Sequence, residues 1–257
     1  MLYLWKLVAI ATITVPASVA TIVIGLFDPN GKNVYGISRL WTSSILRVAG
    51  VSLDVHGLNH LDPNQQYVFM ANHQSNLDIP VLVQALVPFQ LRWIAKRELL
   101  WVPLFGWAMW AAKHLVIDRS DRAEAIGVIN QARKRMAAGI SVVVFPEGTR
   151  SPDGRPLPFK RGGFLLAIKT KKPIVPVTID GSGRILPKGA WGIRGGKIKV
   201  TVGKPLIVDK YRPGTLKALS TALHDVISQD LGIDASVSQE TANVTQVAGA
   251  RAPAKMA

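Results

Sequence analysis

The sequence Asn72-His73-Gln74-Ser75-Asn76-Leu77-Asp78 is a polar turn that joins an apolar run to the start of a predicted helix. The run before it, residues 67–71, is Tyr-Val-Phe-Met-Ala and predicts a buried strand. Ile79-Pro80 after it is typical of a helix entry. The stretch therefore predicts a strand, a polar turn and a helix, in that order.

His73 and Asp78 could act together on such a turn. On one continuous helix they would lie about 140° apart and share no face, but a turn that enters a helix at Pro80 lets them converge. Asp78 near the helix start is a favoured carboxylate and can accept a hydrogen bond from one imidazole nitrogen. The other nitrogen would then be a general base for a hydroxyl. The alternative is a strand-end histidine and a helix-capping aspartate without a shared task.

The rest of the chain alternates short β-branched runs with helical stretches, which predicts one α/β domain with a mostly parallel mixed sheet flanked by helices. Strands are expected at residues 51–56, 67–71, 91–95, 114–118, 141–145, 174–179 and 197–202, and helices at 80–87, 99–112, 121–138, 162–170 and 213–229. Asp121 and Gly139 mark the ends of the clearest helix. The predicted organisation is a membrane-associated helical segment (1–49), a catalytic domain (50–230) and a disordered tail (231–257).

Residues 7–27 are uncharged and almost entirely apolar, and as a helix they would reach about 30 Å, the thickness of a bilayer core. A single spanning helix and a helix interrupted at Val15-Pro16 that lies in one leaflet are both consistent with this run. A cleaved signal peptide is less favoured, because Lys6 is the only charged side chain before the run. Residues 38–49 predict an interfacial helix.

The net charge of +15 and the pI near 10.3 call for an anionic partner. The positive mean hydropathy of +0.22 favours anionic membrane lipids, and no nucleic-acid-binding motif is visible. We expect a bacterial inner membrane, with the Lys- and Arg-rich domain on its cytoplasmic side. The absence of cysteine excludes disulfides, thiolate metal sites and an acyl-thioester on the protein, and the scattered histidines predict no metal site.

A second polar turn, Phe145-Pro146-Glu147-Gly148-Thr149-Arg150, follows another apolar strand. Ligands of open α/β sheets bind where strands end, and Arg150 offers a planar cation suited to a phosphate. Gly148 would allow a close backbone approach, and Glu147 could orient Arg150 or a substrate hydroxyl. The alternative is a surface turn with a solvated ion pair.

Basic residues at two further strand ends could add positive charge to such a site. They are Lys96, Arg97 and Arg119, and each alone is also consistent with a solvated surface. Residues 99–112 carry Trp101, Trp107 and Trp110 among other large apolar groups. These tryptophans could face an acyl chain, the membrane interface or the protein core.

Taken together, these segments resemble the glycerolipid acyltransferase family, and within it the 1-acylglycerol-3-phosphate O-acyltransferases. The resemblance covers roughly residues 50–205. Its blocks, in the family's order, are Asn72-His73 to Asp78 (the His-four residues-Asp motif); Ala95-Lys96-Arg97-Glu98-Leu99 with Pro103 to Trp107 and Ile117 to Ser120; Phe145 to Ser151; and Ile174-Val175-Pro176-Val177. Gln74 stands where the glycerol-3-phosphate variant usually has Arg, which favours a lysophospholipid acceptor.

The resemblance implies that His73, held by Asp78, deprotonates the sn-2 hydroxyl of lysophosphatidic acid, which then attacks an acyl thioester to give phosphatidic acid. Arg150 with Lys96 would bind the phosphate, Glu147 and Gly148 would shape that site, and Val175-Pro176 would line the acyl side. Acyl-CoA or acyl carrier protein would be the co-substrate, with no cofactor. Competing hypotheses are another acceptor such as a lyso-ornithine lipid, a lysophospholipase, and a non-catalytic protein that binds anionic membranes.

Overall fold

A seven-stranded sheet in the order β1-β7-β6-β2-β5-β3-β4 forms the centre of the computed structural model, which describes residues 4–118 and 122–233. The strands are β1 (Val51–His56), β2 (Val68–Ala71), β3 (Leu91–Lys96), β4 (Leu115–Ile117), β5 (Ser141–Val144), β6 (Ile174–Asp180) and β7 (Gly196–Val202). Neighbouring strands run parallel except β6 and β7. The predicted α/β class and mostly parallel mixed sheet are confirmed.

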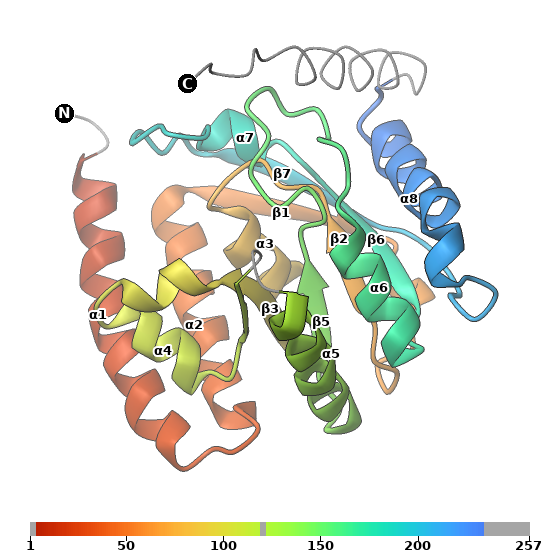
Figure 1. The fold of residues 1–257 in the computed structure, drawn as a ribbon. Coiled ribbons are helices and arrows are strands. Elements are labelled where there is room, and N and C mark those ends of the chain that lie inside the picture. Colours follow the sequence, from red (N-terminus) through yellow and green to blue (C-terminus); the bar gives the residue numbers. More distant parts are fainter. Residues whose placement is uncertain (1–3, 119–121, 234–257) are drawn as a thin grey trace, which may run out of the picture.

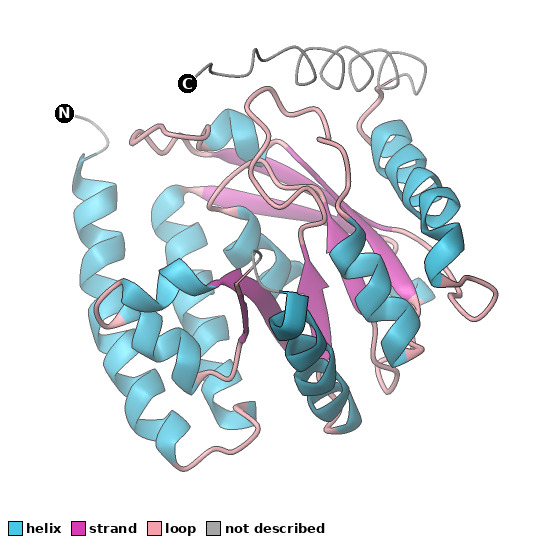
Figure 2. Ribbon diagram, in the orientation of Figure 1, coloured by secondary structure: helices cyan, strands magenta, loops and turns pink. Residues whose placement is uncertain are grey.

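Helices cover both faces of this sheet (Figures 1 and 2). They are α1 (Leu4–Leu26), α2 (Lys32–Ala49), α3 (Asp78–Ala85), α4 (Phe105–Ala111), α5 (Arg122–Ala137), α6 (Arg161–Thr170), α7 (Ser182–Ile185) and α8 (Leu216–Asp230), with 3₁₀ turns η1 (Leu58–His60), η2 (Arg97–Trp101) and η3 (Pro213–Thr215). One apolar cluster lies on the side covered by α1, α2 and α3, and a second lies on the side covered by α5, α6 and α8.

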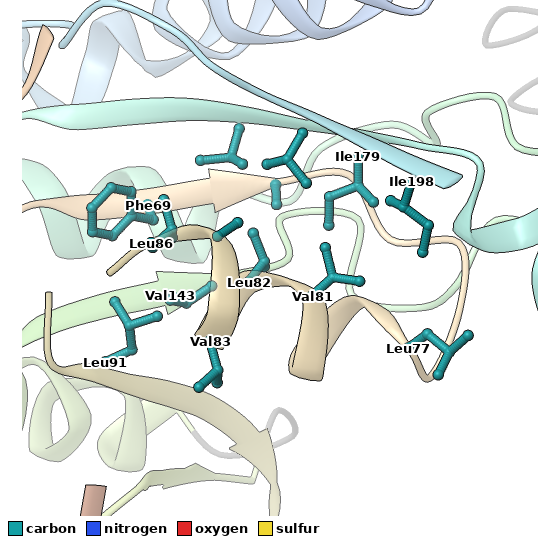
Figure 3. Packing of buried hydrophobic residues seen from close by; sticks show 14 of the residues in the cluster. Phe69, Leu77, Val81, Leu82, Val83, Leu86, Leu91, Val143, Ile179 and Ile198 are labelled. Atoms are coloured by element: carbon teal, nitrogen blue, oxygen red, sulfur yellow. The ribbon is translucent and has the colours of Figure 1, made fainter. Parts of the chain in front are cut away.

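Helix α3 follows the His73 turn and is apolar apart from Asp78 and Gln84, and most of its residues are buried, as is typical of a core helix. Val81, Leu82 and Val83 are buried on it, and Figure 3 shows them packed among side chains of the sheet strands such as Phe69 and Val143. Burying each such side chain stabilises the fold by about 1.5–3 kcal/mol. The start of α3, and with it the His73 turn, is thereby fixed on the sheet.

Several element predictions need correction. Helix α1 is continuous through Pro16, so the interrupted helix is not present. The single helix expected at 99–112 is divided into η2 and α4, because Pro103 and a positive φ of 60° at Leu104 end one turn and redirect the chain. Helix α2 begins earlier than predicted, at Lys32, and the short α7 was not predicted.

Some predictions concern residues that the structure does not describe. Asp121, the expected N-cap of α5, lies outside the described residues, whereas Gly139 follows the end of α5 as predicted and has a left-handed backbone, at φ 86°. The expected tail from Leu231 lies outside the described residues beyond residue 233.

Candidate active site

His73 and Asp78 meet at the end of β2. The His73 Nδ1 atom lies 2.7 Å from Asp78 Oδ2, and the same oxygen accepts the backbone N–H groups of Gln74 and Ser75 at 2.7 and 2.8 Å. Asp78 is fully buried in the first turn of α3, where the helix dipole favours a negative charge. A carboxylate that only accepts makes Nδ1 the donor, so Nε2 is the ring nitrogen able to take a proton.

The ring of Phe145, itself stacked with Trp93, holds the imidazole in place. The His73 ring stacks on Phe145 with centroids 3.9 Å apart and an angle of 13°, and Trp93 is stacked with Phe145 at 6.0 Å. The His73 side chain keeps 16% of its surface exposed. Its orientation is therefore set by a carboxylate at one nitrogen and by a flat apolar surface.

The backbone of His73 is bound on both sides by the second polar turn. Its N–H donates to Glu147 Oε1 at 2.8 Å, and its C=O accepts the Ser151 N–H at 2.7 Å. The other Glu147 oxygen accepts the Leu157 N–H at 3.0 Å. Burial raises the pKa of Glu147 to about 7, and the two backbone N–H groups offset part of that rise. Glu147 thus joins three loop segments.

Three further buried polar side chains tie the His73 turn to segments distant in sequence. The Asn72 amide makes two hydrogen bonds to the Ile179 backbone, at 2.9 Å through Nδ2 and 2.8 Å through Oδ1. Gln74 Nε2 donates to Gly154 O at 3.0 Å, and Ser75 Oγ donates to Leu186 O at 2.8 Å. Sequence reasoning missed these contacts, although a run of polar residues beside a buried strand was a signal for them.

An apolar cavity of about 740 Å³ opens beside His73, within the usual size range of small-molecule sites. Among its polar lining residues, His73, Thr149 and Arg150 follow β2 and β5, and Lys96 is the last residue of β3. Parallel strands bring these ends to one edge of the sheet. Most of the remaining wall is apolar and comes from α1, α2, α3 and α4.

Of the other predicted binding residues, some line the cavity and others make contacts elsewhere. Gly148, at φ 75°, lines the cavity beside Thr149 and Arg150. Arg97 instead forms ion pairs with Glu124 and, at 3.9 Å, with Asp118. Glu147 is 2% exposed, and it contributes to the site by accepting the backbone N–H of His73, which lines the cavity.

Two more predicted binding residues, expected on the acyl side, do not contribute to the cavity wall that the structure describes. Val175 and Pro176 are buried inside β6, away from the cavity lining, because both faces of that central strand are covered. Arg119 lies outside the described residues. Gln74, which was not predicted to bind substrate, is buried, and its side-chain amide donates a hydrogen bond to Gly154 O.

Lys188 was missed by the sequence analysis. Its Nζ donates to Arg150 O at 3.0 Å and lies 3.5 Å from Thr149 Oγ1, so it adds a cation beside the Thr149–Arg150 turn. Over residues 4–118 and 122–233, no three His, Cys, Asp or Glu side chains are grouped to hold a metal ion.

Comparisons with known proteins agree with this geometry. A family model described as Acyltransferase matches residues 52–180. The 1-acyl-sn-glycerol-3-phosphate acyltransferase alpha proteins of Bos taurus and Homo sapiens are 36% identical over 204 residues, which cover 78% of this chain and 71% and 72% of theirs. The crystal structure of the 1-acyl-sn-glycerophosphate (LPA) acyltransferase PlsC from Thermotoga maritima has the same fold, with a TM-score of 0.75 at 24% identity, over 89% of this chain and 92% of that one.

Proposed function

The chain belongs to the acyltransferase family, and from that membership we propose that it moves an acyl group from an acyl thioester to the sn-2 hydroxyl of 1-acyl-sn-glycerol 3-phosphate, giving phosphatidic acid. The observation that carries the proposal is the His73–Asp78 hydrogen bond at the polar end of an apolar cavity. The polar end suits a phosphorylated headgroup, and the apolar walls suit an acyl chain.

His73 is the proposed general base. Its Nε2 takes the proton of the sn-2 hydroxyl while that oxygen attacks the thioester carbonyl, so a C–O bond forms. The tetrahedral intermediate then collapses, the C–S bond breaks, and the imidazolium returns the proton to the leaving thiolate. Asp78 stabilises the imidazolium and holds the ring. A positioned base typically contributes about 10² to 10⁴ in rate.

The phosphate would lie against Arg150 and Lys96. Arg150 offers two parallel N–H donors to phosphate oxygens, and Lys96 adds a second charge. Lys188 fixes the Arg150 turn through its carbonyl oxygen. Gly148 and Thr149 shape the turn, and Glu147 holds it against His73.

Either acyl-CoA or acyl carrier protein would suit as the donor, because both are anionic and the chain carries a net charge of +15. The proposed reaction requires no cofactor. Helix α1 includes one stretch long and apolar enough to cross a membrane, which supports membrane association. We propose a bacterial inner membrane as its location, and the Lys and Arg residues that follow α1 favour the cytoplasmic side for the site.

Acyl transfer from acyl-CoA and from acyl carrier protein to lysophosphatidic acid, measured with the purified protein in detergent, tests the proposal. We expect His73→Ala to lower kcat about 10² to 10⁴-fold. Arg150→Ala should raise the acceptor KM about tenfold or more, since a hydrogen bond to a charged group contributes about 1.5–3 kcal/mol.

Arg194→Ala is the control for Arg150, since it replaces an exposed arginine outside the cavity lining and should leave KM unchanged. Failure of the folded native protein to acylate lysophosphatidic acid with either donor would refute the proposed reaction. Full activity of His73→Ala would instead refute the assignment of the base.

A further inference from the structure

The segment 97–111, made of η2 and α4, has two different faces. Phe105, Ala108 and Met109 recur at the spacing of one helical face and line the acyl cavity, together with Leu99 and Val102 of the preceding turn. Trp107 and Trp110 occupy another face of α4 and lie outside the cavity lining. The segment is thus a wall about one helix thick between the cavity and the outside of the protein.

The outer side of this wall is formed by three large aromatic side chains. Trp101 is 82% exposed, Trp107 58% and Trp110 59%. Together they expose roughly 300–500 Å² of mainly apolar side-chain surface, and exposed apolar surface of this extent is often functional. We refer to Trp101, Trp107 and Trp110 as the Trp face.

The composition of α4 points to a lipid rather than an aqueous surrounding. Its sequence, Phe-Gly-Trp-Ala-Met-Trp-Ala, contains no charged residue. A helix that is apolar all round is normally buried in a core or lies in a membrane, yet one side of α4 is open. Tryptophan is the residue enriched where hydrocarbon meets headgroups.

Helix α4, which carries Trp107 and Trp110, packs beside α1. The two helices pack so closely that a Cβ at Gly25 would lie 2.8 Å from the Ala111 carbonyl oxygen, and α4 lies across α1 in Figure 1. Helix α1 has the same division, with Ile10 and Thr21 in the cavity wall and an exposed row outside: Trp5, Val8, Val15, Val19 and Val23. Both cavity walls therefore present apolar surface outward.

The backbone at both ends of α4 is held in unfavourable conformations. Leu104 has φ 60° and ψ −54° at the centre of a γ-turn, in which the Phe105 N–H donates to Pro103 O at 2.7 Å. This form of the turn is rare and strained. Lys113, also at φ 60°, follows the helix and places its ammonium 5.0 Å from the Trp110 ring centroid. A cation beside an exposed tryptophan is suited to the headgroup region of an anionic bilayer.

We propose that the Trp face is a membrane-contact surface, separate from the long apolar helix α1, and that its occupant is the headgroup–acyl boundary of a lipid bilayer. Contact through the Trp face places the wall formed by η2 and α4 in the lipid. The acyl cavity then lies directly behind a layer of side chains embedded in the membrane. The consequence for acyl transfer, which rests on the proposed function, is that a lipid acceptor reaches His73 without leaving the bilayer.

The chain has no cysteine, so single cysteines can carry a fluorescent label without further substitutions. The labelled sites are Trp107→Cys, Trp110→Cys and the control Ile207→Cys, since Ile207 is 55% exposed on the segment after β7. The full chain is reconstituted in vesicles of phosphatidylethanolamine and phosphatidylglycerol. These vesicles also hold a phosphatidylcholine with a nitroxide quencher near the headgroup end of its acyl chain.

We expect quenching of the labels at 107 and 110 to exceed that at 207 by about threefold or more, because interfacial side chains lie at the depth of the quencher. Equal quenching at the three sites would overturn the proposal. The assay involves no acyl transfer, so it still tests the surface if the proposed reaction is refuted.

A second readout uses activity. The double variant Trp107→Ser/Trp110→Ser should acylate an acceptor embedded in vesicles about tenfold more slowly than the native protein, since the apolar surface that contacts the bilayer is lost. With acceptor in detergent micelles its rate should stay within about twofold, because neither side chain lines the cavity. An equal loss in both media would mean that the tryptophans support the fold of the wall, and would overturn the membrane role.

Discussion

At the scale of single residues, the site depends on two buried carboxylates with different partners. Asp78 is fully buried, and one of its oxygens accepts from the His73 ring and two backbone N–H groups. Glu147 accepts two backbone N–H groups. Burial dominates at Glu147 and raises its pKa from the ordinary 4.5 to about 7. The carboxylate nearer to the imidazole therefore orients it, whereas the other positions the backbone and titrates near neutral pH.

The raised pKa of Glu147 predicts a pH dependence of stability. Between about pH 4.5 and pH 7 the native state binds more protons than the unfolded state, so the free energy of unfolding falls as pH rises. The full effect is on the order of 3 kcal/mol. Glu147→Gln removes this contribution, so the variant should gain stability relative to the native protein as pH rises. Denaturant unfolding in detergent from about pH 5 to about pH 8 measures the difference.

Glu98→Gln is the matched control, because Glu98 is exposed on η2. Its stability relative to the native protein should stay constant across the same pH range. If the free energies of unfolding of the native protein and Glu147→Gln instead changed in parallel with pH, the pH dependence would arise from another group.

At the scale of elements, every predicted strand is present, because short β-branched runs report burial in a sheet directly. The division of 99–112 into η2 and α4 was not predicted, since apolar periodicity carries no information about the γ-turn at Leu104. The His73–Asp78 pair could be predicted because its members are five residues apart. The contact between His73 and Glu147 spans 74 residues and depends on the strand order, which no local pattern encodes.

Asn72 connects β2 and β6 just beyond the last paired residues of the two strands. Its side-chain amide pairs with both backbone groups of Ile179 and so extends the contact between β2 and β6 beyond Ala71. Asn72→Ala would leave a buried N–H and C=O without partners, which should cost about 2–5 kcal/mol of unfolding free energy. Denaturant unfolding measures the loss. Asn64→Ala, at an exposed loop position, should change stability by less than about 0.5 kcal/mol. Similar values for both variants would contradict this role of Asn72.

At the scale of the whole molecule, the cavity exists because α1 and α2 lie against the sheet. Their attachment includes Arg92 of β3, which is 1% exposed and donates to Asn30 O at 2.8 Å, Gly31 O at 2.7 Å and Leu91 O at 2.7 Å. Burial lowers the pKa of Arg92 to about 10, so at neutral pH it remains a cation. The connection between the two helices is thus held to the sheet by one buried charge.

Arg92→Met tests whether this attachment is local. Methionine fills much of the volume but leaves the three carbonyl groups without their donor, so we expect the helix connection, residues 27–31, to open more often. Proteolytic cleavage within it should be at least about tenfold faster than in the native protein, since cleavage follows the population of the open form. Backbone amides of β2 and β5 should keep their protection from hydrogen exchange.

Arg47→Met, at an exposed position on α2, should be cleaved at the native rate. If Arg92→Met lost protection in β2 and β5 together with the connection, Arg92 would stabilise the entire fold rather than the attachment of the helix pair.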